Sequence, residues 1–235
     1  MKSVLSLLAV CSLVCNSAQA LDMAALERAM ANSDRPAADK ERDASRQAPA
    51  VLDFLGLEAG MTVLDVNASG GWYTEVLSYA VGSNGQVLMQ NRPGGRSAEA
   101  ATARAGRLAN VDEWLTDISD ISANSVDFAI TALNFHDFHN SNPGAAQGIL
   151  GQVMGALKSG GILAVIDHEG TPGADNVTLH RIAFDDAVKA VLESGFVLAG
   201  ASDVLDNDVD NHSVGPFDPS LERNTDRIVL KFMKL

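Results

Sequence analysis

Cysteine is nearly missing from this sequence, and the two cysteines present lie close together near its beginning. Cys11 and Cys15 both fall within the first twenty of 235 residues. A protein that loses this segment carries no thiol, so we expect no disulfide, no cysteine nucleophile, no covalently attached haem and no cysteine-ligated zinc. A domain of this length buries enough apolar surface to fold without cross-links.

Basic residues are also scarce, because 17 lysines and arginines stand against 30 aspartates and glutamates, for a formal net charge of −13. Such a surface repels phosphate backbones and anionic lipid headgroups. We therefore expect a small-molecule substrate and no nucleic-acid partner. Beyond the first twenty residues no apolar run is long enough to cross a bilayer, so we predict no integral membrane segment in the mature protein.

The first twenty residues have the pattern of a secretory signal peptide. Lys2 supplies a positive charge, Val4 to Val14 is apolar, and Ala18-Gln19-Ala20 offers the small residues that a signal peptidase reads. The apolar run is short for a membrane span. We predict a signal peptide over residues 1–20 and export to the bacterial periplasm. A buried N-terminal helix is the alternative.

Residues 21–60 are expected to form a helical extension. Pro36 and Pro49 stand where helices can begin, and Gly56 where one can end. Charged residues recur there every three or four positions: Arg35, Asp39, Arg42, Asp43 and Arg46. Such charges can pair along one helix face. We favour a solvated face, and a lid over a pocket is the alternative.

From residue 61 to the end, strand patterns alternate with helix patterns. Strands are predicted over 62–66, 86–90, 111–115, 126–133, 162–166, 196–199 and 227–232. Helices are predicted to end at 81 and to span 97–108, 144–158 and 179–193. This alternation indicates a mostly parallel sheet with helices on both faces. We predict one Rossmann-like, doubly wound α/β domain with seven strands over residues 61–235.

A turn of small residues follows the first predicted strand. The segment from Val63 to Glu75 reads VLDVNASGGWYTE, in which the strand ends near Asp65 and a helix begins after the glycines. Doubly wound sheets bind ligands beyond the carboxyl ends of their strands, and small residues let a ligand approach the backbone. Neither the G-x-G-x-x-G pattern of NAD and FAD proteins nor a P-loop pattern is present.

This turn resembles the first motif of the class I S-adenosylmethionine (SAM)-dependent methyltransferases, an Asp/Glu-x-Gly-x-Gly-x-Gly turn that holds the methionine part of the cofactor. More specifically, the chain resembles a family of exported bacterial predicted methyltransferases. The matching segments are spread along the chain: RPAAD (35–39), GWYTE (71–75), NFHD (134–137), ALKSGG (156–161), DH (167–168), LHR (179–181) and TDR (225–227). The resemblance implies SAM as cofactor and a methyltransferase-like domain.

The resemblance also implies a set of cofactor-binding residues. These lie in the turn and after the next two strands: Asp65, Asn67, Ser69, Gly70, Gly71, Gln90 and Asp117. Asn67 and Ser69 stand where the family has glycine, and each adds a Cβ where the cofactor would meet backbone. Gln90 stands where an acidic residue often binds the ribose, and its amide oxygen can still accept a hydrogen bond. Asp117 stands where an acidic residue commonly contacts the adenine.

Histidine and aspartate gather after the strands predicted over 126–133 and 162–166, and at the start of the following helix. We predict that they form the catalytic group: His136, Asp137, Asp167, His168 and His180. Parallel strands end at one edge of a sheet, so we expect these side chains to share a crevice. His136 is our choice for a general base, with the others shaping an acceptor pocket. A metal site and a purely structural role are the alternatives, and we predict no metal.

Residues 206–224 form a long connection before the last strand, and we expect it to cover the pocket. Acidic residues alternate at its start: Asp206, Asp208 and Asp210. A calcium loop would need glycine and glutamate where Asn211 and Phe217 stand, so we expect a solvated acidic loop.

The predicted function is SAM-dependent methylation of an unknown small acceptor. Two alternatives stay open: an exported binding protein that keeps the fold without the chemistry, and a metal-dependent or acid–base enzyme that uses the histidine–aspartate crevice. Fold alone does not decide between them. Cofactor binding separates the first hypothesis from the others, and metal content tests the third.

Overall fold

A seven-stranded sheet forms the centre of the protein, with the order β5-β4-β3-β6-β7-β10-β9 and the short β8 paired to the end of β7. The computed structural model describes residues 19–235, so the predicted signal peptide lies almost entirely outside the described residues. The strands are β3 (Thr62–Val66), β4 (Gln86–Gln90), β5 (Val111–Trp114), β6 (Val126–Ala132), β7 (Leu157–Gly170), β8 (Ile182–Ala183), β9 (Val197–Ser202) and β10 (Arg227–Met233). All neighbours from β5 to β7 are parallel, whereas β10 runs antiparallel to both β7 and β9. The predicted Rossmann-like fold is confirmed.

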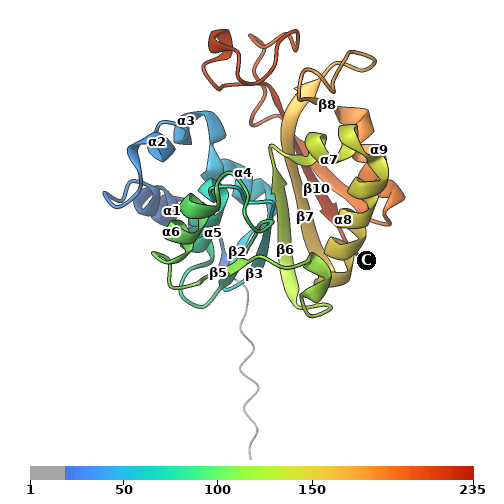
Figure 1. The fold of residues 1–235 in the computed structure, drawn as a ribbon. Helices are drawn as coiled ribbons and strands as arrows, with labels where there is room; N and C mark the ends of the chain where they lie inside the picture. The colour runs from blue at the N-terminus through green and yellow to red at the C-terminus, as the bar shows by residue number, and fades with distance from the viewer. Residues whose placement is uncertain (1–18) are drawn as a thin grey trace, which may run out of the picture.

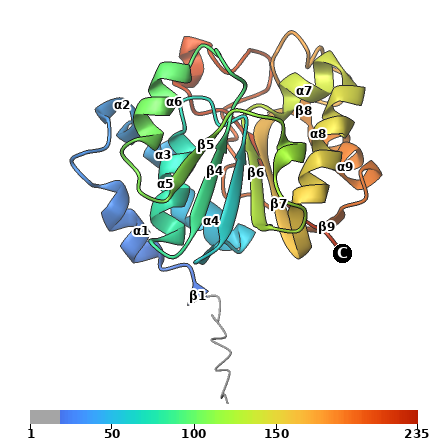
Figure 2. The ribbon, with the colours of Figure 1, turned by 60° about the horizontal axis from the view of Figure 1, so that its bottom comes forward.

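Helices cover both faces of this sheet (Figures 1 and 2). One side carries α1 (Met23–Met30), α2 (Ala37–Lys40), α3 (Asp43–Arg46), α4 (Ala48–Leu55), α5 (Trp72–Val81) and α6 (Ala98–Ala105). The other carries α7 (Phe135–Ser141), α8 (Pro143–Ala156) and α9 (Phe184–Glu193). Single-turn 3₁₀ helices span Ile118–Asp120 and Pro219–Leu221. Within residues 19–235 no helix combines the length and apolarity that crossing a membrane requires.

The central strands are apolar on both sides because each side of the sheet has its own core. Val63 packs in the cluster under α1, α4 and α5, while Leu64 packs in the cluster under α8 and α9, and both are fully buried. Near-continuous apolar runs of this kind are typical of parallel strands covered on both faces. The two layers of helices therefore fix the sheet and leave its carboxyl edge free.

The segment before α9 differs from its prediction. The helix predicted from residue 179 begins only at Phe184, because Ile182 and Ala183 pair with the end of β7 instead. His180 adopts a left-handed backbone with φ of 51°, which an α-helix cannot include. The strand predicted over 162–166 is also longer, since β7 spans 157–170. Both differences bring His180 to the edge of the sheet.

The helical extension packs against the domain, and the expectation that its charged residues form a solvated face is wrong. Arg35 and Asp39 are buried, at 2% and 4% exposure. The Arg35 guanidinium donates to Asp43 at 2.9 Å, and the Trp72 indole donates to the Asp39 carbonyl at 3.0 Å. The last two residues of the predicted signal peptide form β1 (Gln19–Ala20), which pairs antiparallel with β2 (Glu58–Ala59) at the end of the extension. The extension therefore forms a wall of the domain.

Candidate active site

Two cavities lie at the carboxyl ends of the parallel strands, where a doubly wound sheet binds ligands. The larger has a volume of about 900 Å³ and lies between the extension, the turn after β3 and the connection 206–224. The smaller, about 360 Å³, lies beyond β4 and β5 against α7 and α8. Asn67 lines both cavities. The turn after β3 therefore forms the boundary between them.

This turn explains why glycine is favoured at alternate positions of the motif. Asn67, Ser69 and Gly71 all have left-handed backbones, with φ of 51°, 53° and 78°. Glycine adopts this conformation without penalty, asparagine tolerates it, and other residues are strained by about 1–2 kcal/mol. A Cβ on Gly71 would also collide with the side chains of Met89 and Arg104. The chain therefore keeps glycine at the one of these three positions where side chains crowd the backbone.

The end of β4 satisfies the polar backbone of the turn. The Gln90 amide oxygen accepts from the Asn67 N–H at 2.9 Å, and the Gln90 carbonyl accepts from the Ala68 N–H at 2.9 Å. Asn91 Oδ1 accepts from the Ser69 N–H at 2.8 Å. Gln90 lines the smaller cavity, as does Asp117, whose pKa is lowered by hydrogen bonds from Ser119.

Asp65, near the end of β3, is a buried carboxylate that forms no ion pair within residues 19–235. Its side chain is 2% exposed and accepts a hydrogen bond from the Thr74 hydroxyl at 2.6 Å. Burial raises the pKa of Asp65 to about 7, because desolvation outweighs that hydrogen bond and the more distant charge of Arg46. Asp65 lines the larger cavity together with Asn67, Ser69 and the two glycines. The predicted cofactor residues are thus divided between the two cavities.

The predicted catalytic residues lie together around Asp167, which is fully buried at the end of the regular pairing of β7 with β6. Its carboxylate accepts from the backbone N–H and the Nδ1 of His136, both at 2.7 Å, and from the backbone N–H of His168 at 2.8 Å. The ring centroid of His136 lies 5.8 Å from that of His168 and 5.7 Å from that of His180.

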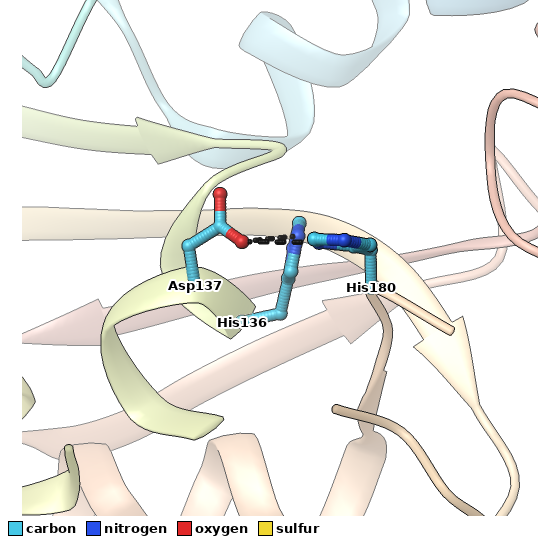
Figure 3. A group of neighbouring side chains, drawn as sticks. All are labelled: His136, Asp137 and His180. Carbon is cyan, nitrogen blue, oxygen red and sulfur yellow. Dashed lines mark hydrogen bonds and ion pairs between the residues drawn. The ribbon is translucent and has the colours of Figure 1, made fainter. Parts of the chain in front are cut away.

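Asp137 connects two of these histidines on the exposed side of the cluster (Figure 3). Its carboxylate lies 3.2 Å from Nε2 of His136 and 3.3 Å from Nδ1 of His180. Because Nδ1 of His136 faces Asp167, the other ring nitrogen, Nε2, faces the open side. Burial lowers the pKa of His136, but the hydrogen bond to Asp167 and the charges of Asp167 and Asp137 outweigh burial and raise it overall.

The same atoms have a spacing that a metal ion could use. One ligand atom each from His136, Asp137 and His180 lies within 4.8 Å of the other two. Two imidazoles and a carboxylate suit zinc or iron, and a carboxylate behind a ligating histidine typically orients its ring. Asp167 occupies that orienting position behind His136. The cluster can therefore hold either a proton or a metal ion at Nε2 of His136.

His168 faces a different environment from His136. Its Nδ1 lies 2.6 Å from the Thr225 hydroxyl, and the residue lines the larger cavity. Burial and the nearby charges of Arg227, His136, Arg181 and Arg46 lower the pKa of His168 well below its usual range. His168 is therefore a neutral imidazole beside the cavity.

The connection 206–224 contributes to the larger cavity through Pro216, Phe217, Glu222 and Arg223. It is anchored by Arg181, whose buried guanidinium donates to Asp210 at 2.8 and 2.9 Å and to the Val214 carbonyl at 3.0 Å. Asp210 is therefore a buried ion-pair partner, and the expectation that it belongs to a solvated acidic loop is wrong.

Sequence patterns alone did not identify several residues of the larger cavity. Arg46 stacks over the rings of Trp72 and Tyr73, with its guanidinium carbon 4.4 and 5.4 Å from their centroids. Arg227, from β10, also lines the cavity. These residues come from distant parts of the chain, and no local pattern distinguishes a cavity arginine from a surface one.

No protein-family model matches this sequence, and no curated protein sequence matches it. The structure is similar to a SAM-dependent methyltransferase from Aquifex aeolicus, with a TM-score of 0.65 and 20% identity over 91% of this chain and 99% of that one. It is also similar to the [4+2]-cyclase SpnF, with a TM-score of 0.61 and 18% identity over 86% and 84% of the two chains. A possible exported protein from Bordetella parapertussis gives a TM-score of 0.54 and 14% identity over 86% and 70%. These similarities show a methyltransferase-type fold, and the cyclase among them shows that the fold does not define the reaction.

Proposed function

We propose that this protein transfers a methyl group from SAM to a small acceptor. The observation that carries the proposal is the pair of cavities on either side of Asn67, at the edge where such sheets bind ligands. SAM consists of a nucleoside joined to an amino acid, so it needs two adjoining sites, one for each part. The methyltransferase-type fold supports the same conclusion.

The residues present fit the cofactor. In the smaller cavity Leu115 and Ile118 provide apolar surface for a base, and Asp117 and Gln90 provide polar groups. In the larger cavity Asp65 has no cation bonded to it among the described residues, which suits the ammonium group of a methionine moiety. Bound there, SAM would supply an electrophilic methyl group.

His136 is the residue that we assign to remove a proton from the acceptor. Asp167 accepts the hydrogen bond from Nδ1 and holds the ring, so that Nε2 is the atom that can take the proton. Asp137 and His180 lie beside this nitrogen and restrict how an acceptor can approach it. His168 is neutral and lines the cavity as a positioning residue for the acceptor.

Methyl-labelled SAM tests this function directly. Purified protein incubated with labelled SAM and a small-molecule extract should transfer the label to an organic compound below protein size. Heat-denatured protein serves as the control for uncatalysed methylation. Failure to bind either SAM or its demethylated product, S-adenosylhomocysteine (SAH), would reject the proposal and favour a binding protein that has kept only the fold.

A metal-dependent enzyme is the second candidate, and the cluster of His136, Asp137 and His180 favours it. The two candidates compete for one atom, because Nε2 of His136 cannot ligate a metal and accept a proton at once. Cobalt(II) provides a test, since binding to two imidazoles gives visible absorption. A one-to-one cobalt complex that His180→Ala abolishes would support the metal enzyme, and no uptake at millimolar cobalt would reject it.

Export is part of the proposal and is supported by the charge of Lys2, the apolar run from Val4 to Val14 and the small residues before Leu21. The full chain produced in a Gram-negative bacterium should appear in the periplasmic fraction with a new N-terminus at Leu21. N-terminal sequencing of the purified protein checks this, and an intact Met1 in a cytoplasmic fraction would contradict it.

A further inference from the structure

Arginine is concentrated at the larger cavity, although the protein as a whole is strongly acidic. Five arginines line it: Arg42, Arg46, Arg104, Arg223 and Arg227. Arg42 and Arg104 both form ion pairs with Asp39, at 3.0 and 2.6 Å, and Arg104 also pairs with Glu75. Arg223 is exposed at the mouth of the cavity, over the ring of Phe217. Arg46 and Arg227 remain as cations inside the cavity.

Arg46 has aromatic neighbours but no polar partner. Within residues 19–235 its guanidinium makes no hydrogen bond and no ion pair, and it is held against Trp72 and Tyr73 by stacking alone. Burial lowers the pKa of Arg46 to about 10, so the group is still charged at neutral pH. The residue lines the larger cavity and is only partly buried, so its guanidinium nitrogen atoms are not enclosed by protein. They are therefore open to the cavity.

Arg227 is 2% exposed and donates only to uncharged oxygens. These belong to the Ser45 carbonyl, the Arg223 carbonyl at 2.7 Å and the Thr225 hydroxyl at 3.0 Å. Thr225 accepts from Arg227, so its own proton can be donated to Nδ1 of His168 at 2.6 Å. This hydrogen-bond chain leaves Nε2–H of His168 as a further donor. Arg227 thus holds His168 in place through Thr225 and has no anionic hydrogen-bond partner in the part of the chain that the structure describes.

Within residues 19–235 no carboxylate forms a hydrogen bond or ion pair with either cation, although Asp65 is near enough to Arg46 for the arginine's charge to lower its pKa. Asp65 is hydrogen-bonded to Thr74, and Asp137 lies with His136 and His180. Glu41 and Glu222 line the cavity but are exposed to solvent. Buried charges are ordinarily paired, so an unpaired guanidinium in a cavity indicates that a ligand supplies the anion.

We propose that the acceptor carries an oxyanion, a carboxylate or a phosphate group, that binds to Arg46 and Arg227. The phenol of Tyr73 has no hydrogen-bond partner within residues 19–235 and lines the same cavity, so it can add a donor. This inference rests on the proposed function, since it names the chemical class of the acceptor.

The methionine carboxylate of the cofactor is the other source of such an oxyanion. The start of α5 offers that carboxylate a separate place to bind, because the N–H groups of Trp72 and Tyr73 have no partner within the helix. Arg227, by contrast, donates to Thr225, the hydrogen-bond partner of His168, and to the carbonyl of Ser45, the residue before Arg46. The arginine pair therefore extends toward the histidine side of the cavity. The acceptor is therefore the ligand that we assign to the arginine pair.

Calorimetric titration of benzoate and of inorganic phosphate, with and without saturating SAH, tests this assignment. At least one anion should bind in the presence of SAH, and Arg46→Met should weaken it about tenfold. Arg28→Met, which removes an exposed arginine of α1, should leave it unchanged. Arg46→Lys should be intermediate, because an ammonium keeps the charge but not the planar donor pair. The melting temperature of each variant establishes that it is folded.

Two results would overturn the assignment. The first is that neither benzoate nor phosphate binds to the wild type at millimolar concentration. The second is that wild type and Arg46→Met bind the anion with equal affinity. A loss of SAH affinity in Arg46→Met, with SAH displacing the anion, would reassign the arginines to the cofactor carboxylate. Anion binding that depends on Arg46 in a protein that fails to bind SAH would uphold the oxyanion site and reject only the methyltransferase.

Discussion

The smaller and the larger cavity meet at Asn67, but they differ in how their polar side chains are satisfied. In the smaller one, the amides of Gln90 and Asn91 are hydrogen-bonded to the turn after β3. In the larger one, no other side chain of residues 19–235 forms an ion pair with Asp65 or with Arg46. In the smaller cavity these amide groups already have hydrogen-bond partners, so a ligand can pack against them. In the larger cavity the charged groups need a ligand to supply their ion-pair partners.

Replacing His136 should have the largest effect on activity, because it removes the group assigned to take the acceptor proton. His136→Ala should lower methyl transfer by about 10²–10⁴-fold while SAH affinity stays within twofold. The rate of label transfer and SAH calorimetry on the same preparation check both parts. His139→Ala is the matched control, because His139 lies on the same helix but its ring is hydrogen-bonded to Asn140 and not to Asp167. Wild-type turnover in His136→Ala would contradict the assignment.

A buried ion pair should contribute to the stability of the fold and not to ligand binding, whereas the unpaired Arg46 should contribute to ligand binding. Arg181→Ala leaves the fully buried Asp210 without its partner and should lower the free energy of unfolding by about 3–5 kcal/mol. Thermal and urea denaturation measure this. Lys189→Ala breaks an exposed contact with Glu193 and should cost less than about 1 kcal/mol. Equal losses in both variants would remove the distinction between the two kinds of charge.

Asp65 should make the ligand-free protein less stable as the pH rises. Its pKa is about 7 in the folded protein against an ordinary value of 3.8, so the folded state holds more protons between these values. This contribution is lost as the pH rises from about 4 to about 7. Asp65→Asn keeps an acceptor for Thr74 and should be more stable than wild type at pH 8 by at most about 4 kcal/mol.

The difference between wild type and Asp65→Asn isolates this group from the other acids. Urea denaturation from pH 4 to pH 8 should show the two stabilities diverging with increasing pH. Asp53→Asn, on the exposed face of α4, should run parallel to wild type. Parallel curves for Asp65→Asn would show that Asp65 is ionised without strain in the folded protein.

The smallest effect is expected at the turn itself. Ser69→Gly removes the strain of a left-handed backbone, and this gain should exceed the cost of the extra freedom that glycine gives the unfolded chain. The variant should therefore be more stable by about 0.5–1 kcal/mol. Ser83 has no positive φ, and Ser83→Gly should therefore destabilise by a similar amount. Denaturation midpoints check both, and the same sign for the two variants would contradict the backbone argument.

The sequence allowed the sheet and the histidine cluster to be predicted because both follow from local patterns and one rule. Strand and helix periodicities gave the order of elements, and parallel strands that share an edge brought His136 to Asp167. The predicted start of α9 was wrong, because the left-handed backbone of His180 and the pairing of β8 with β7 depend on contacts between distant parts of the chain.

The arginine pair could not be predicted from local patterns. Arg46 and Arg227 lie near opposite ends of the chain, Arg46 in a charged helical segment and Arg227 at the start of an apolar strand. Helical spacing favoured a solvated face for Arg35 and Asp39, whereas packing of the extension against Trp72 buries them. Whether such residues are buried depends on which other segments pack against the helix, and the sequence of the helix alone does not indicate this.

Calorimetric titration of SAH into the purified protein tests the central claim most directly, with Asp65→Ala and Asp53→Ala as a matched pair. Both variants remove one carboxylate, but only Asp65 lines the larger cavity. The account predicts micromolar binding to wild type and Asp53→Ala and none to a folded Asp65→Ala. Absence of binding to folded wild type, or equal binding to all three proteins, would contradict it.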